Sequence, residues 1–251
     1  MNELLTVVAL ALLPAAGIFL GGVLAEVFKP SPVAISLALH AAVGLLFGII
    51  AMELVPEASE VLSGWALGGA FILGGVLYLA AEAVAGRLAG GSEGRNGGAG
   101  SKRMWLIYAA VMVDLVSDGI IVGSGSAVAV ALALKLALGQ VLADIPEGYA
   151  TASALQANRV PRGTRLLMMA SFAVPVLIAA VFSNLVLRNL DGVWRFGALA
   201  AIAGLLTLAA IEDMIGEAHE NGPDQRSAAL AVVGGFALFV FVSTGLDQWV
   251  V

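Results

Sequence analysis

The sequence predicts an all-helical membrane protein with eight transmembrane helices. Hydrophobic residues make up 60% of the 251 residues and charged residues only 12%, with a mean hydropathy of +0.99. In ordinary soluble domains about a quarter of the residues are charged. Apolar runs of about 20 residues, the length that a helix needs to cross a bilayer, recur along the chain. The eight runs cover residues 3–25, 33–56, 64–86, 104–132, 137–157, 165–187, 194–216 and 228–250.

The ends and connections of these runs support the same organisation. No basic region precedes the first run, which begins Met1-Asn-Glu3, so we expect a retained span and not a cleaved signal. The connections are short except for a glycine-rich stretch at about 88–103, which has the composition of a flexible linker and separates three spans from five. We expect one transmembrane domain over residues 1–251.

The basic residues predict an orientation. If the N-terminus lies outside, nine of the 12 fall on the inner side and three on the outer side, as the positive-inside rule requires. We therefore expect both termini outside, the linker in the cytoplasm, and the cell (inner) membrane as the location. The nine inner residues are Lys29, Arg87, Arg95, Lys102, Arg103, Arg159, Arg162, Arg165 and Arg226, and the three outer ones are Lys135, Arg188 and Arg195.

Four carboxylates interrupt the fourth and fifth runs. Asp114 and Asp118 are four residues apart, and Asp144 and Glu147 are three apart, so each pair lies on one face of its helix. A charged side chain near the bilayer centre costs roughly 2.5–3.5 kcal/mol even on the lenient insertion scale. Pro146 lacks an N–H and would leave backbone carbonyls free beside these acids. The pattern predicts a bound cation between the two helices.

A short internal repeat joins the second and seventh runs. Met52-Glu53-Leu-Val-Pro-Glu57-Ala is similar to Glu212-Asp213-Met-Ile-Gly-Glu217-Ala, and the two runs are expected to cross the membrane in opposite directions. Such a match is typical of an inverted repeat, although coincidence between two helix ends is an equally good explanation. In this reading the two sets of acids lie at opposite mouths of a path, where they would concentrate cations.

Together these motifs resemble the ZIP (Zrt/Irt-like) family of divalent-metal transporters. The resemblance lies in the eight spans, the glycine-rich loop, Glu53–Ala58, Asp118-Gly119 and, most specifically, Asp144-Ile-Pro-Glu147-Gly148. It implies a 3+2+3 bundle with inverted repeats, a metal site between spans four and five, a homodimer, and inward movement of metal without enzymatic activity. Asp114 stands where the family has histidine, and Leu115 and Val174 replace residues expected at a second metal, so we expect a single site.

The candidate residues follow from these patterns. Oxygen ligands suit Mn²⁺ and Fe²⁺, whereas the resemblance favours Zn²⁺, so the identity of the metal is left undecided. Because Asp114 replaces a histidine, our hypothesis is a preference for manganese. We expect no cofactor other than the transported divalent ion (Zn²⁺, Mn²⁺ or Fe²⁺). The expected partners are divalent metal ions and the lipid bilayer, and no nucleic acid is expected. The predicted metal ligands are Asp114, Asp118, Asp144, Glu147, Met52 and Glu53, and the predicted path residues are Glu57, Glu212, Asp213, Glu217 and His219.

Three other classes of membrane protein also use acidic residues within the membrane. A proton- or sodium-coupled carrier of another cargo would use the same carboxylates as a relay. An intramembrane aspartyl protease would need an aspartate after the glycines of Gly123-Ser-Gly125, and it is absent. A phosphatidyltransferase of the CDP-alcohol type would need a different spacing than that of Asp114 and Asp118, so both enzyme classes are disfavoured.

Overall fold

Helices are the regular secondary structure of the described part of the chain, and short turns connect them. The computed structural model describes residues 3–29, 31–90, 99–219 and 225–250, and it confirms the all-helical prediction for these residues. The long helices are α1 (Glu3–Val27), α2 (Pro32–Ile49), α4 (Gly64–Gly90), α5 (Ala99–Val128), α6 (Val130–Ala157), α8 (Ala173–Leu187), α9 (Gly192–Ala209) and α11 (Gln225–Val250). The short ones are α3 (Val55–Ser59), α7 (Arg162–Ser171) and α10 (Ile215–His219), with two π-helices, η1 (Ile50–Leu54) and η2 (Ala210–Met214).

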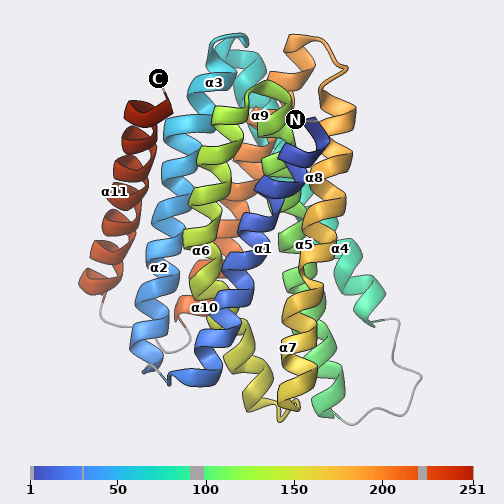
Figure 1. The fold of residues 1–251 in the computed structure, drawn as a ribbon, viewed down its shortest axis with the longest axis vertical. Helices are drawn as coiled ribbons and strands as arrows, with labels where there is room; N and C mark the ends of the chain where they lie inside the picture. The colour runs from blue at the N-terminus through green and yellow to red at the C-terminus, as the bar shows by residue number, and fades with distance from the viewer. Residues whose placement is uncertain (1–2, 30, 91–98, 220–224, 251) are drawn as a thin grey trace.

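The long apolar helices are compatible, by length and composition, with a multi-pass membrane protein. Among the described residues, seven stretches could cross a bilayer. The 28-residue α6 is long enough to be an eighth, but it carries Lys135, Asp144 and Glu147 within its apolar sequence. The start of α1 and the end of α11 lie at the same end of the bundle (Figure 1), as an even number of crossings requires. Half of the predicted linker, residues 91–98, lies outside the described residues.

The boundary between the fourth and fifth spans differs from the prediction. Lys135 was expected in an outer loop, which is wrong, because Ala129 alone separates α5 from α6 in an extended conformation (φ −154°, ψ 143°). Lys135 therefore lies in the second turn of α6. Helix α6 also continues through Pro146 without a break.

The helices divide into two sets according to their closest neighbours. In the first, here called the site bundle, α1 packs along α6 and α5 along α8, and the two pairs meet through α5–α6 and α1–α8 contacts. In the second, here called the flanking pairs, α2 packs along α11 and α4 along α9. In Figure 1, α2 and α11 lie at one edge of the molecule and α4 towards the other.

Glycine contacts fix the spacing within the flanking pairs. A Cβ added to Gly44 would lie 1.9 Å from the Val232 carbonyl oxygen, and one added to Gly204 would lie 1.9 Å from that of Phe71. The reciprocal glycines, Gly235 on α11 and Gly74 on α4, lie just as close to the facing helix. Backbones can approach this closely only where small residues meet, which is how membrane helices commonly associate.

The predicted similarity between spans two and seven extends to their structure. The successive elements α2, η1 and α3 have the same lengths as α9, η2 and α10, and each begins 160 residues before its counterpart, as Pro32 and Gly192 show. Gly44 and Gly204 are related by the same offset. The α3 end of one segment and the α10 end of the other lie at opposite ends of the bundle (Figure 1), so the segments run in opposite directions.

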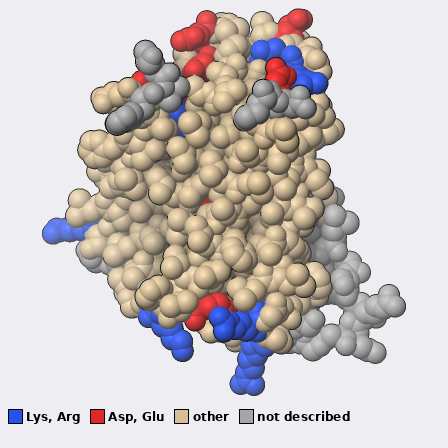
Figure 2. Space-filling model, in the orientation of Figure 1, with Lys and Arg blue, Asp and Glu red and all other residues tan. Residues whose placement is uncertain are grey.

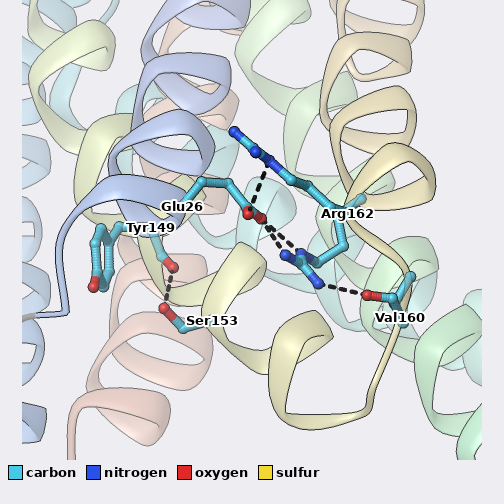
Figure 3. A network of polar contacts seen from close by, with 6 residues as sticks. Glu26, Tyr149, Ser153, Val160 and Arg162 are labelled. Atoms are coloured by element: carbon cyan, nitrogen blue, oxygen red, sulfur yellow. Dashed lines mark hydrogen bonds and ion pairs between the residues drawn. The ribbon is translucent and has the colours of Figure 1, made fainter.

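Charged side chains gather towards the ends of the molecule. On the face shown in Figure 2, a broad band with few charges separates two charged ends. At one end, the buried Glu26 carboxylate of α1 accepts a hydrogen bond from Arg165 Nε (2.7 Å) and pairs with Arg162 (3.5 Å), while Arg165 also donates to the Val160 carbonyl oxygen (Figure 3). The Tyr149 hydroxyl adds a hydrogen bond to the Phe28 carbonyl oxygen (2.9 Å). These contacts fasten the end of α1 to α6 and α7.

Candidate cation site between α5 and α6

The α5 half of the site centres on Asp118. Its side chain is 4% exposed, whereas Asp114, one turn earlier, is half-buried. Gly119 and Gly123 lie against α8, and a Cβ on Gly119 would lie 2.3 Å from the Val176 carbonyl oxygen. Because these glycines carry no side chain, α5 and α8 can approach closely, and the contact fixes α5 beside α8 at the level of Asp118.

The α6 half presents three buried polar side chains on one face. Gln140, Asp144 and Glu147 follow each other at intervals of four and three residues, and their exposed fractions are 0%, 3% and 8%. The backbone of α1 passes directly beside them, because a Cβ on Gly17 would lie 3.2 Å from the Cβ of Asp144. Helices α1, α5 and α6 therefore lie around Asp118, Asp144 and Glu147, which are buried.

A hydrogen bond joins the two halves, while the negative charges of their carboxylates repel each other. Gln140 Nε2 donates to Asp118 Oδ1 at 2.5 Å. The Asp144 carboxylate lies close enough to Asp118 and Asp114 for their negative charges to repel. Within the described part of the chain, Asp118 Oδ2, Asp144 Oδ2 and Gln140 Oε1 are buried and accept no hydrogen bond. Buried carboxylates in this situation must gain a cation or a proton.

The acids alone do not form a finished metal site. Among the described side chains, no group of three or more His, Cys, Asp or Glu residues is placed to hold a metal ion as it stands. What the structure brings together from the predicted ligands is the α5–α6 set, Asp114, Asp118 and Asp144, with Glu147 one turn further along α6.

Glu53 belongs to a different cluster, near the α3 end of the bundle. Both of its oxygens are engaged, one with Lys135 Nζ at 3.3 Å and the other with the Ser243 hydroxyl, which donates to it. Lys135 Nζ also lies 2.6 Å from Asp247 Oδ1. This cluster ties α6 of the site bundle to η1 and α11 of the flanking pairs. Met52 is 41% exposed, and no described hydrogen bond or ion pair links Met52 or Glu53 to the α5–α6 acids.

Removing Lys135 should destabilise the protein. Glu53 is 5% exposed, and Lys135→Ala would leave its negative charge buried without the nearby cation. Loss of one partner of a buried ion pair costs about 3–5 kcal/mol. We expect a lower melting temperature in detergent for Lys135→Ala, and recovery of most of the loss in the double variant Lys135→Ala/Glu53→Gln. Equal melting temperatures for Lys135→Ala and the native chain would contradict this account of the cluster.

The predicted path residues lie on the two related segments. Glu57 is half-buried on α3, within electrostatic reach of Glu53 and Glu60, and Glu212 is exposed on η2. Asp213 belongs to η2 and Glu217 and His219 to α10, but their side chains lie outside the described part. Since α3 and α10 lie at opposite ends of the bundle (Figure 1), these two acid sets occupy opposite ends.

Two functional residues were missed by sequence reasoning. Gln140 lies one turn before Asp144 in an apolar helix, and a polar residue at that spacing was a usable signal. Lys135 was assigned to a loop, although a single lysine in an apolar run close to buried acids also indicates an ion pair.

Comparison with other proteins adds no family assignment. Neither protein-family models nor curated proteins give a match to this chain.

Proposed function

We propose that the protein moves divalent metal cations across the membrane, inward, through a site held by α5 and α6. The observation that carries this proposal is the pair Asp118 and Asp144, which are 4% and 3% exposed and each have an oxygen that accepts no hydrogen bond in the described chain. A divalent ion would neutralise both charges and satisfy both oxygens. Glu147 and Asp114 extend the same faces and complete the proposed site.

The architecture inferred from the ZIP resemblance also belongs to this proposal. We infer a 3+2+3 bundle in which spans one to three and six to eight are inverted repeats. Support comes from the equal lengths and opposite directions of α2–η1–α3 and α9–η2–α10, and from the neighbour pairs. Exchanging the repeats converts α1–α6 into α8–α5 and α2–α11 into α9–α4. A homodimer in the bacterial inner membrane, with both termini outside, remains part of the proposal.

Metal uptake into proteoliposomes tests the function and the manganese hypothesis together. Carboxylate oxygens are hard ligands that suit Mn²⁺, and Asp114 replaces the imidazole that would favour Zn²⁺. We expect saturable Mn²⁺ uptake that is absent from protein-free vesicles and that requires several-fold more Zn²⁺ than Mn²⁺ for half-inhibition. Zn²⁺ inhibition at concentrations far below those of Mn²⁺ would contradict the manganese preference without affecting the transport proposal.

A second candidate rests on the same buried acids. Because no three described acids or histidines form a ready metal site, a proton shared between Asp118 and Asp144 could satisfy them instead. The protein would then be a proton- or sodium-coupled carrier of another cargo. Flux driven by a pH or sodium gradient, in vesicles that take up no divalent metal, would support this candidate and exclude the first.

A further inference from the structure

Gln140 is an uncharged polar residue that lies beside the acids Asp118 and Asp144. Its side chain is fully buried, and the nitrogen and the oxygen of its amide differ in their hydrogen bonding. Nε2 donates to Asp118 Oδ1 at 2.5 Å, whereas Oε1 accepts no hydrogen bond from the described residues. A buried amide carbonyl without a donor is costly, and such a group in a native protein calls for an explanation.

The oxygens that lack donors belong to neighbouring residues. Asp118 is joined to Gln140 by the hydrogen bond, Asp144 lies one turn from Gln140 on α6, and Asp118 and Asp144 repel each other. A single proton can satisfy at most two of these three oxygens, because it is bound to one oxygen and that O–H donates to one other. One cation can accept all three oxygens as ligands.

We propose that Gln140 is a ligand of the transported cation through Oε1 and orients Asp118 for the same ion through Nε2. This inference rests on the proposed function. The carboxylates by themselves fall short of a three-ligand group of acids and histidines, and the amide supplies the missing oxygen without adding negative charge to a buried site. Amide and carboxylate oxygens together form an all-oxygen set, which Mn²⁺ and Mg²⁺ accept more readily than Zn²⁺ does.

Two substitutions separate a ligand from a residue that only orients Asp118. Gln140→Leu removes both the donor and the oxygen, while Gln140→Glu keeps an oxygen at the same position but cannot donate when ionised. Gln156→Leu is the matched control, since Gln156 lies on the same helix and is exposed. Equilibrium Mn²⁺ and Zn²⁺ binding is measured on the purified full chain in nanodiscs, together with uptake in proteoliposomes.

The ligand role predicts a specific order of affinities. Gln140→Leu should bind Mn²⁺ about tenfold or more weakly, with a smaller loss for Zn²⁺, while Gln140→Glu should bind Mn²⁺ at least as tightly as the native chain. Gln156→Leu should be unchanged. If Gln140→Leu does not fold, the Mn²⁺ affinity of Gln140→Glu is compared with that of the native chain. If Gln140 only orients Asp118, the Gln140→Glu variant should bind Mn²⁺ more weakly than the native chain.

Unchanged Mn²⁺ affinity in folded Gln140→Leu, or a Gln140→Glu affinity well below the native value, would overturn the assignment while leaving the proposed function intact. A native chain that binds no divalent cation would overturn both.

Discussion

Asp144→Asn is expected to abolish cation uptake while the protein still inserts and folds. The substitution keeps the size of the side chain but removes the charge of a 3% exposed residue whose Oδ2 accepts no hydrogen bond in the described chain. Without that charge, one of the two facing carboxylates can no longer contribute to neutralising a divalent ion. Changes to groups that merely support metal ligands already cost 10–100-fold, so we expect uptake to fall by more than about 100-fold.

The control for this prediction is Glu60→Gln, an exposed carboxylate close to the end of α3. It should transport as the native chain does, and Glu147→Ala should share the loss shown by Asp144→Asn. Because asparagine relieves the repulsion from Asp118, the melting temperature of Asp144→Asn should not fall. Native rates of metal uptake in Asp144→Asn, measured at saturating and limiting Mn²⁺, would show that this carboxylate does not hold the transported ion.

Gly204→Ala is expected to have the largest effect on folding. A Cβ at this position would lie 1.9 Å from the Phe71 carbonyl oxygen and 2.7 Å from its carbonyl carbon, and backbone atoms cannot move aside as a flexible side chain can. Overpacking of this kind costs about 1–3 kcal/mol of stability. Because the contact is with backbone, we expect the cost of Gly204→Ala to lie at or above the upper end of this range. We expect a clearly lower melting temperature and less protein recovered from the membrane in folded form.

Gly197→Ala provides a matched control on the same helix. Nothing lies within 4 Å of the position that its Cβ would occupy, so it should melt as the native chain does or slightly higher. Gly44→Ala, the counterpart of Gly204→Ala on α2, should reproduce the loss because its Cβ would meet the Val232 carbonyl oxygen. Similar melting temperatures for Gly204→Ala and Gly197→Ala would mean that α4 and α9 are not held by this contact.

The helices could be predicted from the sequence because the bilayer demands long apolar runs. Every predicted span coincides for most of its length with described helix, and each includes most of one long helix. The turn between α5 and α6 could not be placed, since apolar residues continue through it and a single extended alanine, Ala129, makes the connection. Helix α6 continues through Pro146, because a helix enclosed by neighbours can lose one hydrogen bond without breaking.

For the acids of the candidate site, the sequence could predict only the helix face on which each one lies. Their spacing placed Asp118 and Asp144 on particular sides of two helices, but which helices meet depends on tertiary contacts that the pattern does not contain. For the same reason the sequence offered Glu53 as a ligand, whereas the fold gives it Lys135 and Ser243 as partners. Gln140 was missed because an uncharged polar residue in an apolar run is a weak signal until its neighbour across the helix contact is known.

Anomalous scattering from crystals of the protein soaked in Mn²⁺ tests the central claim most directly. The account predicts one strong manganese peak between α5 and α6, within about 2.0–2.6 Å of oxygens from Asp118 and Asp144. It would be contradicted by a well-ordered map with no manganese there, in which each of these carboxylates is separately hydrogen-bonded to protein groups.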